Sequence, residues 1–234
     1  MDRPTDTPTQ PPASVLTTER RTQLHRRVRW IVSITIAYNL IEAVVAIAAG
    51  GAASSSALIG FGLDSLIEVA SAVAVAWQFS RTDPERYEQA TLRAISLAFF
   101  ALAAYLAANA ALTLSGALTP EHSPIGIALT ALSVVIMPLL SWFERHTGRE
   151  LGSATVVADS KQTLLCGYLS VAVLLGLLLN SLFGWAFADA VAALVIAVFA
   201  VREGVEAWRG DSCATPAGIL LEDDEREHAH HGQH

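Results

Sequence analysis

The sequence predicts an all-α membrane protein with six transmembrane helices and with both termini in the cytoplasm. Hydrophobic residues make up 53% of the 234-residue chain, and the mean hydropathy is +0.44. This is more apolar material than a soluble core needs, and it lies in long runs. Six runs each approach the ~20 residues that a helix needs to cross a bilayer core: 30–49, 57–79, 91–114, 124–143, 154–179 and 185–207. They lack the short alternating pattern of outer-membrane strands.

The arginines predict the orientation of these helices. They lie before the first run and after the second, fourth and sixth runs, at Arg20, Arg21, Arg26, Arg27, Arg29, Arg81, Arg86, Arg93, Arg145, Arg149, Arg202 and Arg209. The loops AGGAASSS, SGALTPEHS and NSLFG between the other runs contain no arginine or lysine. Because loops rich in Lys and Arg stay on the cytoplasmic side, we expect both termini there.

The two ends of the chain differ from its apolar middle. Residues 1–20 are polar and rich in Pro and Thr, lack the features of a cleavable signal peptide, and are expected to form a disordered cytoplasmic arm. Residues 21–209 form the predicted six-helix domain. Residues 210–234 are expected to be an acidic, His-rich cytoplasmic tail, which contributes much of the net charge of −7. Cys166 and Cys213 lie at different depths, so no disulfide is expected.

Two acids in the second run are the first candidates for a functional site. An ionised carboxylate near the centre of a membrane helix costs about 2.5–3.5 kcal/mol, so it usually faces a cavity, a partner or an ion. Asp64 and Glu68 are four residues apart and therefore lie on one helix face, one turn from each other. A cation between them would remove their mutual repulsion. The alternative is that they form hydrogen bonds between helices.

The fifth run offers a second pair at the same spacing, Gln162 and Cys166. With a rise of ~1.5 Å per residue, Glu68 is level with Gln162 and Asp64 with Cys166 when the two antiparallel helices face each other. Four ligands from two helices suit a tetrahedral ion such as Zn²⁺, and the thiol disfavours Mg²⁺ and Ca²⁺. Cys166 taken alone is equally well explained as a small buried hydrophobe.

The six runs, with the motif LDSLIE in the second and ADSKQTLLC in the fifth, resemble the transmembrane domain of the cation diffusion facilitator (cation efflux) family. The resemblance covers roughly residues 20–209. It implies export of zinc, or of Cd²⁺, Co²⁺ or Ni²⁺, from the cytoplasm in exchange for protons, and a homodimer. It maps the family's two ligand pairs onto Asp64 with Glu68 and onto Gln162 with Cys166, where the family usually has His and Asp. The chain resembles a divergent branch without the family's C-terminal cytoplasmic domain.

Further polar residues in the runs are candidates for accessory roles. Asp159 would guide the ion at the cytoplasmic side of the site, and Asn39 and Glu42 in the first run would do the same, although packing hydrogen bonds explain them equally well. Lys161, the only lysine, is expected to pair with Asp189, Glu42 or Asp159. Its alternative role is a counter-charge that replaces the metal.

The tail contains four histidines, His228, His230, His231 and His234, beside an acidic segment. Short His-rich tracts bind Zn²⁺, Ni²⁺ or Co²⁺, so metal capture is one interpretation. A solvated disordered tail is the other.

The motifs of nucleotide-binding enzymes and hydrolases, GxxxxGK, GxSxG and HExxH, do not occur in the sequence, and neither an enzymatic activity nor a nucleic-acid partner is expected. Heavy use of Ala and Arg is typical of a GC-rich bacterial genome, which places the chain in a bacterial cytoplasmic membrane. Two rival hypotheses remain. One is a membrane sensor or accessory protein that keeps the fold with a decayed metal site, and the other is a transporter of a different substrate.

Overall fold

The computed structural model describes residues 18–79, 85–151 and 154–209, and in these ranges every regular element is a helix. The helices are α1 (Thr18–Ala53), α2 (Ser56–Phe79), α3 (Glu85–Leu114), α4 (Pro124–Leu151), α5 (Ala154–Phe183) and α6 (Ala186–Arg209). Each apolar run predicted from the sequence lies in one helix, apart from Trp185 directly before α6, so the six-helix fold is confirmed. Because α1 begins at Thr18, the last three residues of the expected arm are helical. Residues 1–17 and 210–234 lie outside the described part of the chain.

Helix length and surface chemistry both fit a bilayer. Four helices, α1, α3, α4 and α5, contain segments long and apolar enough to cross a membrane. The other two, α2 and α6, have 24 residues each, which corresponds to ~36 Å of helix against a bilayer core of ~30 Å. Large apolar side chains such as Leu182 and Val198 are about 70% exposed (73% and 69%) on the outer surface, where lipid replaces water as the solvent.

Aromatic side chains lie near both ends of the helices. At the start of α6, Trp185 stacks on Phe187 and lies against Phe183. At the end of the same helix, Trp208 lies under the guanidinium of Arg93 from α3. The two tryptophans are separated by 23 residues, or ~34 Å of helix. This separation matches two aromatic belts at opposite membrane interfaces.

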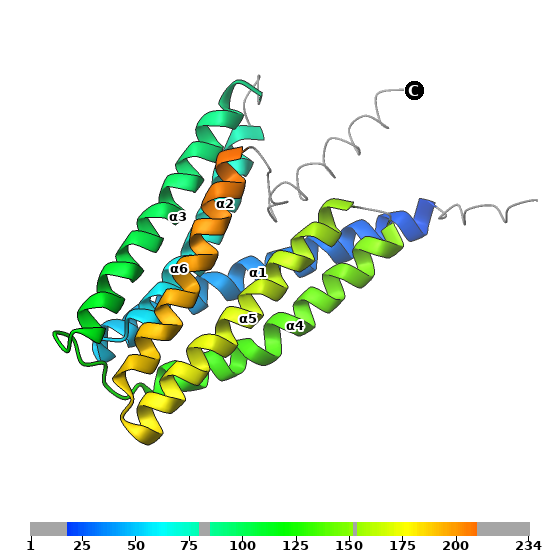
Figure 1. Ribbon diagram of the computed structural model, residues 1–234. Coiled ribbons are helices and arrows are strands. Elements are labelled where there is room, and N and C mark those ends of the chain that lie inside the picture. Colours follow the sequence, from blue (N-terminus) through cyan, green and yellow to red (C-terminus); the bar gives the residue numbers. More distant parts are fainter. Residues whose placement is uncertain (1–17, 80–84, 152–153, 210–234) are drawn as a thin grey trace, which may run out of the picture.

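The helices form two groups that meet at one end (Figure 1). α4 packs mainly on α5, and α3 packs mainly on α6; α1 packs on both α2 and α4, and α2 also packs on α3 and α6. In Figure 1 the groups lie together at the end where α5 stops and α6 starts, and they point apart toward the end where α1 starts and α6 stops. The predicted arginine-rich side is the end at which the groups diverge.

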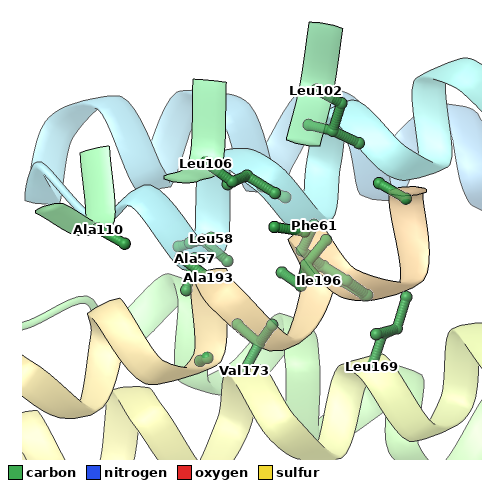
Figure 2. Packing of buried hydrophobic residues seen from close by; sticks show 14 of the residues in the cluster. Ala57, Leu58, Phe61, Leu102, Leu106, Ala110, Leu169, Val173, Ala193 and Ile196 are labelled. Atoms are coloured by element: carbon green, nitrogen blue, oxygen red, sulfur yellow. The ribbon is translucent and has the colours of Figure 1, made fainter. Parts of the chain in front are cut away.

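The apolar core occupies the half of the bundle where the two groups meet. Figure 2 shows Phe61 of α2 and Ile196 of α6 in contact, between Leu106 of α3 and Val173 of α5. All four side chains are fully buried. Asp64 follows Phe61 by one helical turn, so the polar site begins directly below this apolar layer.

A carboxylate from α6 caps the first turn of α2 at this end of the bundle. Asp189 accepts hydrogen bonds from the backbone N–H of Ser56 at 3.0 Å and of Ala57 at 3.3 Å. It also accepts bonds from the hydroxyls of Ser55 and Ser56. A negative charge at a helix N-terminus satisfies the unpaired N–H groups and the helix dipole. Asp189 therefore joins α6 to α2 and is not a partner for Lys161.

Candidate functional site

One face of α1 carries a buried polar stripe that organises the site. Thr35, Tyr38, Asn39 and Glu42 follow the spacing i, i+3, i+4 and i+7, so they lie on one side of the helix. Each contacts a polar side chain of another helix: Thr35 meets α4, Tyr38 meets α4, Asn39 meets α2, and Glu42 meets both. The stripe explains why α1 packs against both groups of helices.

Glu42 is the one carboxylate of the stripe. Its side chain is 0% exposed. One carboxylate oxygen accepts a bond from Ser65 of α2 at 2.9 Å, and the other accepts a bond from Ser133 of α4. The Ser133 hydroxyl in turn lies 2.8 Å from the hydroxyl of Tyr38. Packing hydrogen bonds, one of the two interpretations offered by the sequence, are therefore present around Glu42.

The two acids of α2 lie in different surroundings. Glu68 accepts a hydrogen bond from Nδ2 of Asn39 at 2.9 Å and faces α1 and α5. Asp64 is buried and lies within electrostatic reach of Glu203 on α6 and of Glu42 on α1. Like charges that are close together and shielded from water repel strongly. This part of the bundle therefore has the electrostatic character of a cation site.

The pair on α5 faces the pair on α2. Nε2 of Gln162 donates a hydrogen bond to Oε1 of Glu68 at 3.4 Å. Cys166 is buried and lies among Glu68, Glu42 and Asp64, with its thiol beside the Ser65 hydroxyl. The structure thus brings the four residues singled out in the sequence to one contact between α2 and α5.

In the part of the chain that the structure describes, no three His, Cys, Asp or Glu side chains lie close enough together to hold a metal ion as they stand. The Glu68 carboxylate is instead bound by two amide groups. An ion that enters this site must displace or turn these amides.

The accessory residues predicted from the sequence have different outcomes. Asn39 and Glu42 lie in the site. The Asp159 side chain and the histidines His228, His230, His231 and His234 fall outside the described residues. The Lys161 side chain is exposed. Its predicted pairing with Glu42 is wrong because that acid is buried and bonded to serines, and its pairing with Asp189 is wrong because that acid caps α2.

A further buried carboxylate, Glu144, was missed in the sequence. It lies on α4 and is 1% exposed. It accepts hydrogen bonds from Thr35 of α1 at 3.0 Å and from Thr163 of α5 at 2.8 Å. Glu144 directly follows the apolar run 124–143, which hid its burial, because α4 continues to Leu151. The signal that could have pointed to it is the spacing of Thr35, Asn39 and Glu42 along the first run. This spacing places a polar face on that helix, and such a face requires polar partners on neighbouring helices.

Comparison with known proteins points to the same kind of molecule. The cation efflux transmembrane domain family matches residues 32–209. The chain is 26% identical over 179 residues to an uncharacterized transporter of Methanocaldococcus jannaschii, which covers 72% of this chain and 63% of that protein. It is 24% identical over 153 residues to Transmembrane protein 163 of Xenopus laevis, which covers 64% of this chain and 54% of that protein. The chain spans less than two thirds of the length of both relatives. Because the family match covers well over half of the sequence, this chain belongs to the cation efflux family of membrane transporters.

Proposed function

We propose that the chain exports a divalent metal cation, zinc in the first place, across the cytoplasmic membrane in exchange for protons. The cation binds at mid-membrane between α2 and α5, at Asp64, Glu68, Gln162 and Cys166. Cd²⁺, Co²⁺ and Ni²⁺ are further cargo candidates. The observation that carries the proposal is the gathering of buried acids and one thiol where α1, α2 and α5 meet.

The donor chemistry supports a borderline divalent ion. Two carboxylates and a thiolate favour Zn²⁺ and its neighbours over Mg²⁺ and Ca²⁺, because sulfur is a poor ligand for hard cations. Asp64 also has acidic neighbours on both α1 and α6. A bound cation relieves this repulsion, which gives the site a physical reason to take up positive charge inside a membrane.

Proton exchange follows from the same ligands. A metal ion binds the deprotonated forms of carboxylates and thiols, so loading the site expels protons and unloading it returns them. No histidine lies in the described membrane helices at the level of the site. The acids Asp64 and Glu68 therefore carry the exchanged protons, and Cys166 contributes a third.

The arrangement of the helices supports release and uptake on opposite sides. The apolar layer around Phe61 and Ile196 separates the site from the end where the two groups meet. The groups diverge toward the arginine-rich end. Movement of the group α2, α3 and α6 against the group α1, α4 and α5 moves access from the cytoplasm to the other side.

The homodimer implied by the family resemblance is part of the same proposal. Ala101, Ala104, Ala108 and Ala111 are exposed on α3 and lie along one face of the helix. Small residues permit close approach of two membrane helices. A second copy packed on this face would cover them without any extramembrane domain.

Metal tolerance in a bacterial strain stripped of its own exporters tests the transport function. The wild-type chain is expected to restore growth in zinc, whereas Asp64→Ala and Cys166→Ala remove the protection. Glu121→Ala is the matched control, because Glu121 is an exposed acid outside the site, and it should protect as well as the wild type. Membrane abundance of each variant is measured in parallel.

Each outcome has a defined meaning. Full protection by Asp64→Ala refutes the antiporter. If Cys166→Ala protects the cells and Asp64→Ala does not, the acids bind the metal and the thiol is not a ligand. A well-expressed wild-type chain that protects against none of the four metals favours a sensor or accessory protein.

A further inference from the structure

Asn39 on α1 contains a buried polar atom that the proposed site does not yet explain. Its side chain is 6% exposed. Its Nδ2 donates to Glu68 at 2.9 Å. Among the residues that the structure describes, its Oδ1 is the one buried side-chain polar atom with no hydrogen-bond partner. A buried acceptor without a donor is unfavourable, so such an atom requires an explanation.

The position of this oxygen is fixed by the bond on its own amide. Oδ1 and Nδ2 share one carbon atom, so a half-turn of the amide group brings Oδ1 to the Glu68 carboxylate that Nδ2 now contacts. An amide oxygen accepts hydrogen bonds and coordinates cations, and it has no proton to donate. Burial of Oδ1 without a donor therefore makes sense if a cation is the partner that it takes up.

We propose that Asn39 is a ligand of the transported cation and that α1 is the third helix of the metal site. In the unloaded state the amide nitrogens of Asn39 and Gln162 donate to Glu68 and take the place of the positive charge. When the cation binds, both amides turn their oxygens toward it. The inference deepens the proposed function and rests on it, because it presupposes a cation at Glu68.

The proposal also explains why the described residues contain no ready-made cluster of three His, Cys, Asp or Glu ligands. Part of the ligand set consists of amides. A site with Asp64, Glu68, two amide oxygens and one thiol is richer in oxygen than a site built from His and Asp with Cys. Such a donor set shifts preference toward ions that accept oxygen ligands, such as Mn²⁺, Co²⁺ and Zn²⁺, and away from Cd²⁺.

The test is metal binding by the purified full-length protein in lipid nanodiscs. Asn39→Leu removes the oxygen and keeps the branched shape of the side chain, and Asn39→Asp keeps an oxygen while removing the donor to Glu68. Asn180→Leu is the matched control: Asn180 is an equally buried asparagine whose Nδ2 bonds the backbone oxygen of Pro120 at 3.0 Å, away from the site. Titration calorimetry with Zn²⁺ and the visible spectrum of bound Co²⁺ are the readouts.

A ligand role and a structural role predict different results. If Asn39 is a ligand, Asn39→Leu weakens Zn²⁺ binding roughly 10–100-fold and changes the Co²⁺ spectrum, whereas Asn180→Leu changes neither. Asn39→Asp binds Zn²⁺ at least as tightly as the wild type and gains a larger thermal stabilisation from it. A purely structural donor predicts a lower unfolding midpoint in Asn39→Leu, with wild-type Zn²⁺ affinity and an unchanged Co²⁺ spectrum.

Failure of this inference is distinguishable from failure of the proposed function. The role of Asn39 is overturned, and the site stays intact, if Asn39→Leu keeps the wild-type affinity and Co²⁺ spectrum while Glu68→Gln loses metal binding. Unchanged binding in both Glu68→Gln and Asp64→Asn overturns the site itself. If Asn39→Leu does not fold, Asn39→Ala, which removes the same oxygen without added bulk, decides by the same two readouts.

Discussion

Replacement of Asp189 by alanine tests whether the cap between α6 and α2 stabilises the bundle. The change leaves the backbone N–H groups of Ser56 and Ala57 without their acceptor. The serine hydroxyls can turn to other partners, and the Ser55 hydroxyl already accepts a bond from the N–H of Leu58 at 3.2 Å. The two backbone groups cannot turn. We therefore expect the main cost to come from them.

The magnitude follows from these contacts. Each buried donor without an acceptor costs about 1–3 kcal/mol, and the lost charge at the helix N-terminus adds about 0.3–1 kcal/mol. The sum for Asp189→Ala is about 2–7 kcal/mol. Asp189→Asn keeps one acceptor oxygen and should lose less than half of this. Because 1 kcal/mol corresponds to about 2–4 °C for a protein of this size, even the lower limit gives a measurable shift.

Thermal unfolding of the detergent-solubilised protein, followed by tryptophan fluorescence, is the assay. Glu121→Ala removes an exposed carboxylate from the loop at the same end of the bundle and is the control. The expected order of midpoints is wild type equal to Glu121→Ala, then Asp189→Asn, then Asp189→Ala. A shift of 1 °C corresponds to roughly a quarter to half of 1 kcal/mol. An unfolding midpoint of Asp189→Ala that lies within about 1 °C of the wild-type midpoint would therefore refute the reasoning.

Two further substitutions test the packing around the site. Gly62→Ala should destabilise the protein by about 1–3 kcal/mol, because its Cβ would lie 2.9 Å from the Cβ of Ala46 and 3.0 Å from the backbone oxygen of Ala43. Gly51→Ala is the control, because a Cβ at that position would meet nothing within 4 Å. Equal unfolding midpoints of the two variants would count against close packing of α1 on α2. Thr163→Val should cost about 1–3 kcal/mol, because it removes one donor from buried Glu144. Thr130→Val is its control, since that hydroxyl bonds the backbone of its own helix at 2.8 Å, and an effect no larger than the control's would contradict the role given to Thr163.

The sequence was sufficient to predict the six helices because the bilayer fixes both their length and their composition. A run near 20 apolar residues has few other uses. It was also sufficient to predict that Gln162 of α5 and Glu68 of α2 lie at the same depth. The constant rise per residue of a helix converts sequence positions in antiparallel helices into depth. These predictions needed no knowledge of side-chain contacts.

The polar contacts within the bundle could not be predicted in the same way. Tyr38, Ser65 and Ser133 cost little to bury when they are paired, so single hydroxyls give no warning in a sequence. Glu144 was missed because hydropathy located the end of the fourth run before the helix ends. The pairing of Lys161 with Asp189 failed on geometry: Lys161 is 22 residues, or ~33 Å of helix, from the end of α5 next to which α6 and Asp189 begin.

The central claim is that the acids at the contact of α1, α2 and α5 bind a transported divalent cation. Zinc entry into proteoliposomes under an imposed pH gradient, with a zinc indicator and a pH indicator inside, tests it most directly. The account predicts that wild type moves zinc and protons in opposite directions, and that Glu68→Gln and Asp64→Asn stop both movements while Glu121→Gln stops neither. Zinc entry that continues unchanged in Glu68→Gln and Asp64→Asn would contradict it.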